Sequence, residues 1–326
     1  MAFTIPTGLD ARPVAVIGAG TLGRRIAMMY ATRGGQVRIS DPSPEARRDA
    51  LDYIGRNLEQ VVGHVNGGAP GEVSATGDLS EAVAGCWLVV EAVPERLELK
   101  KQIFGDLDRL APADAILASN SSSYPTSQFI DRVDRPERVV NMHFYMPPVQ
   151  PAVDLMSSGR TDRAVLDLLL KELPGYGVHP FEAHRESTGF IFNRIWAAIK
   201  REALSMVAEG VSTPQDVDRM WQINMGTPAG PFRMMDMVGL DVVLDIENHY
   251  AAERPELPAG PRELLQRYVD AGDRAPRPAA ASTTTTPPAP DPTRLVARDQ
   301  EPADVDDVRT ALPDSRRHPA FRPSHI

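Results

Sequence analysis

The fold is decided by the stretch Val14-Ala15-Val16-Ile17-Gly18-Ala19-Gly20-Thr21-Leu22-Gly23. Its first four residues suit a short strand buried on both faces, and the glycines that follow have the spacing G-x-G-x-x-G. Helical sequence runs from Arg24 to Thr32, and a second strand, Val37 to Ser40, ends at Asp41. A strand, a tight turn, a helix and a strand with an acidic residue 23 positions after the first glycine indicate a dinucleotide-binding unit.

Each glycine of the turn has a separate task in such a unit. Gly18 allows the tight turn, Gly20 lets the backbone approach a pyrophosphate at the helix N-terminus, and Gly23 permits close packing of helix on strand. Asp41 can accept hydrogen bonds from the adenosine ribose, and its charge opposes a 2′-phosphate. The sequence therefore predicts NAD in preference to NADP. The alternative is a tight strand-to-helix turn that binds nothing.

Strands and helices continue to alternate after Asp41. The patterns predict helices at Pro44 to Val65, Leu97 to Leu110 and Asp162 to Glu172, and strands at Leu88 to Val93, Ala115 to Ser119, Arg138 to Phe144, Ala152 to Met156 and near Val178. Such alternation is typical of a mostly parallel, doubly wound sheet. We expect an α/β domain of the Rossmann type over residues 1–186.

The chain changes character from Ser187, and we expect a smaller, all-helical domain over residues 187–272. Ile191, Ile195 and Ile199 recur on one stripe of the segment Phe190 to Glu209, which predicts a helix buried on a broad face. Trp196, Ala203 and Val207 lie beside that stripe. Residues 273–326 are rich in Pro, Ala, Thr and Arg and carry few large apolar side chains. Such a segment cannot bury enough surface to order itself, so we expect a disordered C-terminal tail.

Composition excludes several classes of protein. The 326 residues have a net charge of −9, which repels phosphate backbones, so nucleic acid is not an expected partner. Glu91 interrupts the longest apolar run, and the first 13 residues lack the features of a secretory signal, so we expect no membrane span and a cytoplasmic location. The one cysteine, Cys86, excludes a disulfide framework. No residue spacing resembles a metal-ligand set, so no metal is expected.

Six blocks in one order resemble the 3-hydroxyacyl-CoA dehydrogenase family, and the resemblance runs from about Val14 to about Ala271. The blocks are Val16 to Gly23, Val90-Glu91-Ala92-Val93-Pro94-Glu95, Ala118-Ser119-Asn120-Ser121-Ser122-Ser123, Asn141-Met142-His143-Phe144, Gly189-Phe190-Ile191-Phe192-Asn193-Arg194 and Gly230-Pro231-Phe232. The family joins an NAD-binding Rossmann-type domain to a helical domain that dimerises. The resemblance therefore implies NAD, an acyl-CoA or 3-hydroxy acid substrate, and a homodimer formed through the helical domain.

Position by position, the resemblance places the family's catalytic base on His143, its substrate-contacting serine on Ser122 and its asparagine on Asn193. The chemistry also calls for such a set, because oxidation of a secondary alcohol needs a base for the hydroxyl proton, and imidazole is suited to that task. Ser122 and Asn193 can hold the oxygen that becomes a carbonyl. The glutamate that partners the family's histidine falls on Asp154, which is one methylene shorter. The alternative for Asp154 is an ordinary carboxylate at a strand end.

The resemblance also implies contacts to the cofactor from outside the glycine turn. Glu95 and Lys100 fall where the family has a glutamate and a lysine near the nicotinamide ribose, and the alternative is an exposed pair at the start of a helix. The full set of cofactor-binding residues that we expect is Gly18, Gly20, Thr21, Leu22, Gly23, Asp41, Glu95, Lys100 and Asn120.

We expect an NAD-dependent oxidoreductase that interconverts a 3-hydroxyacyl-CoA, or a related 3-hydroxy acid, and its 3-oxo form. Two alternatives stay open: a relative acting on a free acid, such as a sugar acid or a carnitine-like compound, and a dinucleotide-binding protein without turnover. Two departures from the family pattern keep them open. Phe144-Tyr145-Met146-Pro147-Pro148 stands where members usually have an asparagine and a single proline, and the chain from Arg274 lacks the glycine-rich closing segment.

Overall fold

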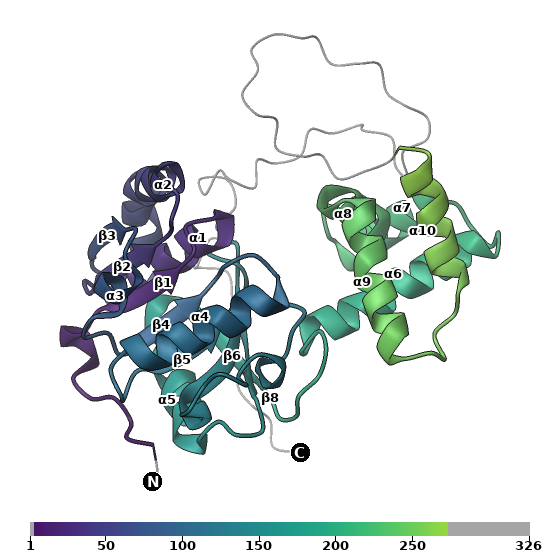
Figure 1. Ribbon diagram of the computed structural model, residues 1–326. Coiled ribbons are helices and arrows are strands. Elements are labelled where there is room, and N and C mark those ends of the chain that lie inside the picture. Colours follow the sequence, from purple (N-terminus) through teal and green to yellow (C-terminus); the bar gives the residue numbers. More distant parts are fainter. Residues whose placement is uncertain (1–2, 273–326) are drawn as a thin grey trace, which may run out of the picture. The chain divides into compact units, whose positions relative to one another are not determined.

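The computed structural model describes residues 3–272, which form two compact units (Figure 1). The first unit extends to Phe190, and the second begins at Ile191. The expected tail over residues 273–326 lies outside the described residues. None of the described helices has the length and apolar content needed to cross a bilayer.

The first unit is built on one sheet of eight strands in the order β3-β2-β1-β4-β5-β6-β7-β8. The strands are β1 (Val14–Ile17), β2 (Gln36–Ser40), β3 (Glu72–Thr76), β4 (Leu88–Glu91), β5 (Ile116–Ser119), β6 (Val139–Met146), β7 (Gln150–Ser157) and β8 (His179–Ala183). Neighbouring strands pair in parallel except β6 and β7, which form an antiparallel pair. The prediction of a mostly parallel, doubly wound sheet is confirmed.

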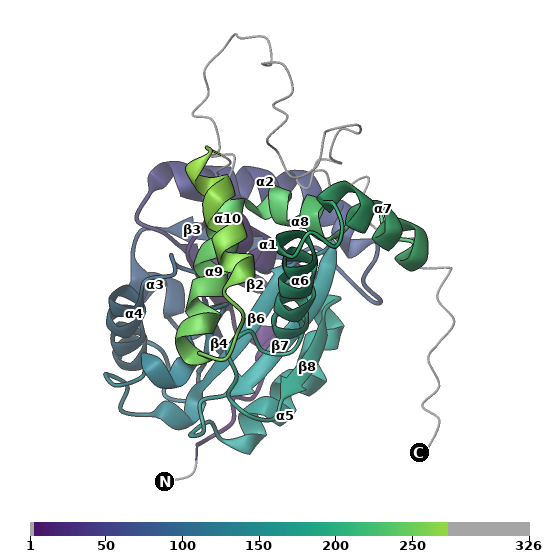
Figure 2. The same ribbon diagram turned by 90° about the vertical axis from the view of Figure 1, so that its right-hand side faces the viewer.

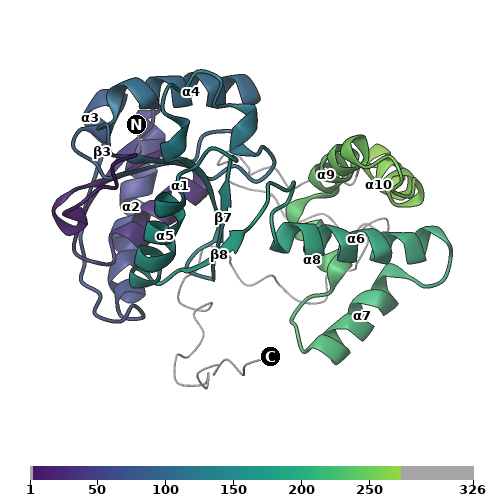
Figure 3. The ribbon, with the colours of Figure 1, turned by 90° about the horizontal axis from the view of Figure 1, so that it is seen from below.

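Helices cover both faces of this sheet (Figure 3). One core lies under α1 (Thr21–Tyr30), α2 (Pro44–Val62), α5 (Arg163–Glu172) and the short helix η4 (Leu173–Tyr176). The other core lies under α3 (Leu79–Val83) and α4 (Leu97–Leu110). The central strands β1, β4 and β5 are buried along their whole length, including the polar residues Glu91 and Ser119 that end β4 and β5. Three further short helices are η1 (Leu9–Ala11), η2 (Thr126–Gln128) and η3 (Pro136–Arg138).

The chain order places a switch point between β1 and β4. From β1 the chain proceeds to β2 and β3 on one side, and it then crosses to β4 on the other side of β1. In sheets of this kind the ligand binds outside the carboxyl ends of the strands at the switch point. Ile17 and Glu91 are register partners at the carboxyl ends of β1 and β4. Gly18 and Ala92, which follow them in the chain, therefore lie at the switch point.

The second unit consists of α6 (Phe192–Ala208), α7 (Pro214–Met225), α8 (Pro231–Val238), α9 (Leu240–Glu253) and α10 (Gly260–Asp270). Helix α10 lies beside both α6 and α9 (Figure 2). The Asp218 carboxylate of α7 accepts backbone hydrogen bonds from Phe232 and Arg233, both at 2.8 Å, and so caps the start of α8. Burial raises the pKa of Asp218 although these two donors act in the opposite direction.

The structure corrects the predicted packing of α6. Ile191 and Ile195 are exposed, by 38% and 55%, whereas Ala203 and Leu204 enter the core of the second unit with residues of α8, α9 and α10. The first turns of the predicted face are therefore exposed, whereas its later part, which includes Ala203, is buried as predicted. The strand β3 and the helix α3 were not predicted, because both elements are short and β3 alternates polar and small residues in the manner of an edge strand.

Candidate active site

The glycine turn has the geometry that a bound pyrophosphate requires. Gly18 has a φ of 110°, and a Cβ there would lie 2.5 Å from the carbonyl oxygen of Ala92. A Cβ on Gly23 would lie 2.0 Å from the carbonyl oxygen of Gly18, so α1 packs directly on the turn. A Cβ on Gly20, in contrast, would meet nothing within 4 Å. Gly20 therefore borders open space at the N-terminus of α1, where unpaired N–H groups favour an anion. Thr21 is exposed and Leu22 half-buried in the same turn.

Asp41 lies beside the glycine turn at the end of β2. Its Oδ2 accepts a hydrogen bond from the backbone N–H of Ala19 at 2.9 Å, and its Oδ1 accepts one from that of Ser43 at 2.8 Å. Each carboxylate oxygen has a further lone pair that can accept a ribose hydroxyl. Asp41, the predicted ribose acceptor, therefore contacts the glycine turn.

Glu95 and Lys100 belong to a charged network at the carboxyl end of β4. Lys100 Nζ lies 2.9 Å from Glu91 Oε1 and 3.1 Å from Glu95 Oε2, and its side chain is only 1% exposed. The alternative of an exposed pair is therefore wrong for Lys100. Glu91 is fully buried and also accepts hydrogen bonds from the Ser119 hydroxyl at 2.6 Å and the backbone N–H of Val93 at 2.9 Å. The contacts of Glu91 in this network were not predicted, although a carboxylate within an apolar strand could have indicated them.

Glu95 faces the loop that follows β5. A third of its side chain is exposed, and Oε1 accepts hydrogen bonds from the Ser121 hydroxyl and from the backbone N–H of Ser123. Burial disfavours the charged form of Glu95, but the ammonium of Lys100 and these hydrogen bonds outweigh it and lower the pKa of Glu95. Glu95 therefore stays ionised and holds the serine loop against the end of β4.

The same loop carries Asn120 and Ser122. The side-chain oxygen of Asn120 accepts a hydrogen bond from the backbone N–H of Phe144 at 2.8 Å, which ties the end of β5 to the middle of β6. Ser122 is exposed two residues later. Because β5 and β6 are parallel neighbours, with Ser119 opposite Asn141, both Ser122 and His143 lie beyond the carboxyl end of β5.

His143 and Asp154 are register partners on the antiparallel strands β6 and β7. Nδ1 of His143 lies 3.6 Å from Oδ2 of Asp154, and both side chains are almost fully buried, with 6% and 3% exposed. Sequence reasoning placed this aspartate as the histidine's partner, and the structure brings the two together. Asp154 Oδ2 also accepts a hydrogen bond from the hydroxyl of Tyr145, a contact that was not predicted.

Two aromatic rings enclose the imidazole of His143. Tyr145 contacts it edge-on at a centroid distance of 4.7 Å, and Phe190 stacks parallel to it at 5.1 Å with an interplanar angle of 3°. Phe190 has a φ of 51°, a left-handed conformation that is uncommon for a bulky side chain. This strained residue therefore fixes the plane of the imidazole.

Asn193 belongs to the other unit. It is half-buried in the first turn of α6, where it lies three residues after Phe190 in the chain. The structure therefore gathers the predicted residues Gly18 to Gly23, Asp41, Glu95, Lys100, Asn120, Ser122, His143 and Asp154 in the first unit, and it leaves Asn193 in the second.

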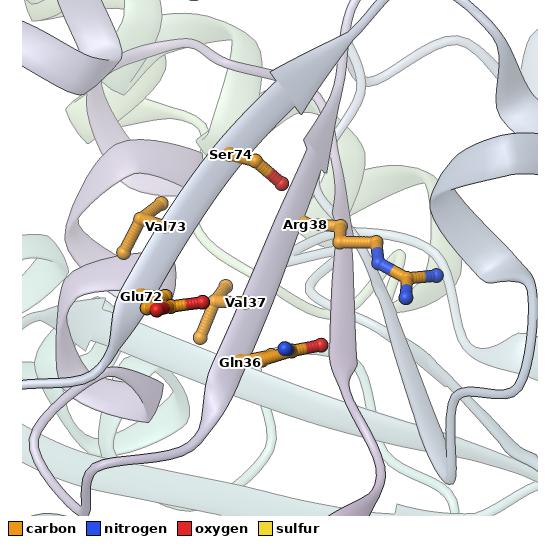
Figure 4. A pocket seen from close by; sticks show the side chains of 6 residues that line it. All are labelled: Gln36, Val37, Arg38, Glu72, Val73 and Ser74. Atoms are coloured by element: carbon orange, nitrogen blue, oxygen red, sulfur yellow. The ribbon is translucent and has the colours of Figure 1, made fainter.

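A surface hollow lies elsewhere on the first unit (Figure 4). Its lining side chains come from β2 and β3 and are Gln36, Val37, Arg38, Glu72, Val73 and Ser74. Gln36 and Glu72 begin these parallel strands, whereas the glycine turn lies at the carboxyl ends of the sheet, so the hollow is separate from the predicted cofactor site. Among the described residues, no cluster of three or more His, Cys, Asp or Glu side chains is placed to hold a metal ion.

Together, the open glycine turn, the ribose acceptor and the buried histidine beyond the strand ends define a dinucleotide-dependent oxidoreductase. Comparison with known families agrees. The family model described as the NAD-binding domain of 3-hydroxyacyl-CoA dehydrogenase matches residues 13–186, and the model of that family's C-terminal domain matches residues 189–279. The chain belongs to the 3-hydroxyacyl-CoA dehydrogenase family and is an NAD-dependent dehydrogenase.

Characterised relatives differ in the substrates that their names state. The chain is 33% identical over 267 residues to a 3-hydroxybutyryl-CoA dehydrogenase of Mycobacterium tuberculosis, covering 79% of this chain and 93% of the relative. It is 30% identical over 249 residues to a 5-formyl-3-hydroxy-2-methylpyridine 4-carboxylate 5-dehydrogenase of Mesorhizobium japonicum, covering 74% and 81%. It is 35% identical over 213 residues to an L-carnitine dehydrogenase of Streptomyces griseus, covering 64% and 63%.

A solved structure supports the same relationship. The crystal structure of FadB2 from Mycobacterium tuberculosis superposes with a TM-score of 0.72 at 32% sequence identity, covering 82% of this chain and 96% of that protein.

Proposed function

We propose that this protein oxidises a 3-hydroxyacyl-CoA, or a related 3-hydroxy acid, to its 3-oxo form with His143 as the general base. The observation that carries the proposal is the buried pair of His143 and Asp154 on adjacent strands, beyond the carboxyl ends of the strands that carry the glycine turn. The residues present fit NAD, because Gly20 leaves room for a pyrophosphate and Asp41 can accept a ribose hydroxyl. When bound, NAD accepts the hydride from the substrate carbon.

The chain's own residues move the proton. Nδ1 of His143 faces Asp154, so Nε2 is the nitrogen left to take the hydroxyl proton from the substrate. The negative charge of Asp154 then stabilises the imidazolium through Nδ1. Ser122, exposed in the loop after β5, holds the substrate oxygen as it becomes a carbonyl, and we assign the same task to Asn193 from its place in the motif. In the reverse reaction His143 returns the proton.

The same site supports a second substrate class, a free 3-hydroxy acid. Two observations favour this class. Relatives named for L-carnitine and for a pyridine carboxylate match the chain. Met146-Pro147-Pro148, at the end of the histidine strand β6, also departs from the family's usual sequence. A substrate panel with NAD separates the two classes. NADH formation with 3-hydroxybutyryl-CoA but not with free 3-hydroxybutyrate supports the CoA ester, and the reverse result supports the free acid.

Replacement of the base tests the mechanism. We expect His143→Ala to lose roughly 10²- to 10⁴-fold in turnover while it still binds NADH. His64→Ala removes an exposed histidine in the same unit and should match the wild type. Turnover in His143→Ala that equals that of the wild type would refute the mechanism. A wild-type protein that binds NADH tightly but oxidises no 3-hydroxy compound would instead favour the dinucleotide-binding protein without turnover.

We also infer a homodimer formed through the helical unit, and a cytoplasmic location. Large apolar side chains that are exposed on this unit support the dimer, and they include Met220, Ile223 and Met225 of α7, each at least 60% exposed. Sedimentation of the purified protein tests the dimer, and cell fractionation tests the location.

A further inference from the structure

The carboxylate of Asp154 is buried but does not form a hydrogen bond with His143. The distance of 3.6 Å between Nδ1 and Oδ2 is too long for one, and Nδ1 is buried without a hydrogen-bond partner among the described residues. Within residues 3–272, the donor to this carboxylate is the hydroxyl of Tyr145. A buried carboxylate without a hydrogen bond is costly, so the Tyr145 hydroxyl satisfies the Asp154 carboxylate where the histidine does not.

The strand geometry explains how Tyr145 reaches this position. His143 and Tyr145 are two residues apart on β6, and Asp154 is the register partner of His143 on β7. The β6–β7 register shifts between Phe144 and Met146, so Tyr145 lies at an irregularity where the strand bends. There its ring touches the edge of the imidazole while its hydroxyl meets Oδ2 of Asp154.

We propose that Tyr145 is a positioning residue that holds the Asp154 carboxylate aimed at Nδ1 of His143. The proposal rests on the proposed function, in which the imidazolium needs a fixed negative charge. Aspartate is one methylene shorter than the glutamate that the family resemblance leads us to expect, and the Tyr145 hydroxyl supplies the hydrogen bond that this shorter side chain does not make with the histidine. Tyr145 keeps its own proton throughout.

Kinetics of Tyr145→Phe test this role. We expect kcat to fall roughly ten- to a hundredfold, the effect of removing a hydrogen bond to a charged group, while the affinity for NADH is unchanged. In an Asp154→Asn background, where no charge remains to be held, Tyr145→Phe should have no further effect. Tyr176→Phe is the matched control, because it removes a hydroxyl from a buried tyrosine of the same unit that packs on Tyr30. Equal losses from Tyr145→Phe in both backgrounds would overturn the proposal.

A second measurement does not depend on turnover. Nitrogen NMR of the imidazole reports which ring nitrogen carries the proton, and the charge of Asp154 should keep it on Nδ1 in the wild type. We expect both Tyr145→Phe and Asp154→Asn to shift the His143 signals toward a mixture of tautomers. An unchanged pattern in Tyr145→Phe would overturn the proposal even in an active enzyme. A wild type without turnover would refute the proposed function, and the tautomer result would still decide the role of Tyr145.

Discussion

Replacing Gly20 with alanine should separate cofactor binding from folding. The backbone of Gly20 has a φ of −65°, which alanine adopts freely, and the added Cβ would meet no protein atom within 4 Å. The free energy of unfolding should therefore stay within about 0.5 kcal/mol of the wild type. The methyl group would occupy the space where a pyrophosphate approaches the helix N-terminus. We expect NADH affinity to fall at least tenfold, or about 1.4 kcal/mol.

Titration calorimetry with NADH and urea unfolding of the same preparations measure the two quantities. Gly23→Ala provides the contrast, because its Cβ would lie 2.0 Å from the carbonyl oxygen of Gly18 and would force α1 away from β1. That variant should lose about 1–3 kcal/mol or more of stability. Wild-type NADH affinity in Gly20→Ala, or a loss of stability as large as that of Gly23→Ala, would refute the assignment of this space to the cofactor.

Three further predictions concern other charged or reactive groups of the first unit. The pKa of Glu95 is lowered in the folded protein, so its ionised form adds stability that is present above about pH 4.3 and lost as the pH falls through the folded pKa. The stability difference between wild type and Glu95→Gln, measured by urea unfolding, should therefore shrink on acidification; a constant difference would contradict this. Arg138 and Asp108 form a buried ion pair at 2.8 Å, so Asp108→Asn, which leaves the guanidinium uncompensated, should cost about 3–5 kcal/mol in the same assay. Burial raises the pKa of Cys86 to about 12, so mass spectrometry should find no iodoacetamide adduct at pH 8 in the native protein and a single adduct after unfolding.

Local patterns were sufficient to predict the architecture. The run Val14 to Ile17, followed by three spaced glycines, has few alternatives to a buried strand and a phosphate-binding turn, and the later strands are short apolar runs of the same kind. The exposed strand β3 was missed because its alternation of polar and small residues also suits a loop. For α6, helical periodicity identified an apolar stripe, but periodicity alone does not say whether its own unit covers that stripe.

The catalytic set was predicted less completely, because side-chain partners are set by pairing across strands. The family resemblance, and no local pattern, placed Asp154 beside His143, and nothing in the sequence indicates that Tyr145 donates to the same carboxylate. The burial of Lys100 between two glutamates likewise depends on the turn from β4 into α4, and the resemblance, which assigned Glu95 and Lys100 to the cofactor, did not indicate it. The distance between two residues on different strands cannot be predicted from the sequence around either of them.

The contacts of Asp41 restrict any redesign of the coenzyme preference. The carboxylate that should repel a 2′-phosphate also accepts hydrogen bonds from the backbone N–H groups of Ala19 and Ser43. It therefore stabilises the glycine turn. Replacement of Asp41 by alanine or arginine would remove both the repulsion of a 2′-phosphate and the two hydrogen bonds from Ala19 and Ser43. An engineer seeking an NADP-dependent form would do better with asparagine or serine at this site, which remain acceptors without the charge, and with a cation introduced on a neighbouring residue.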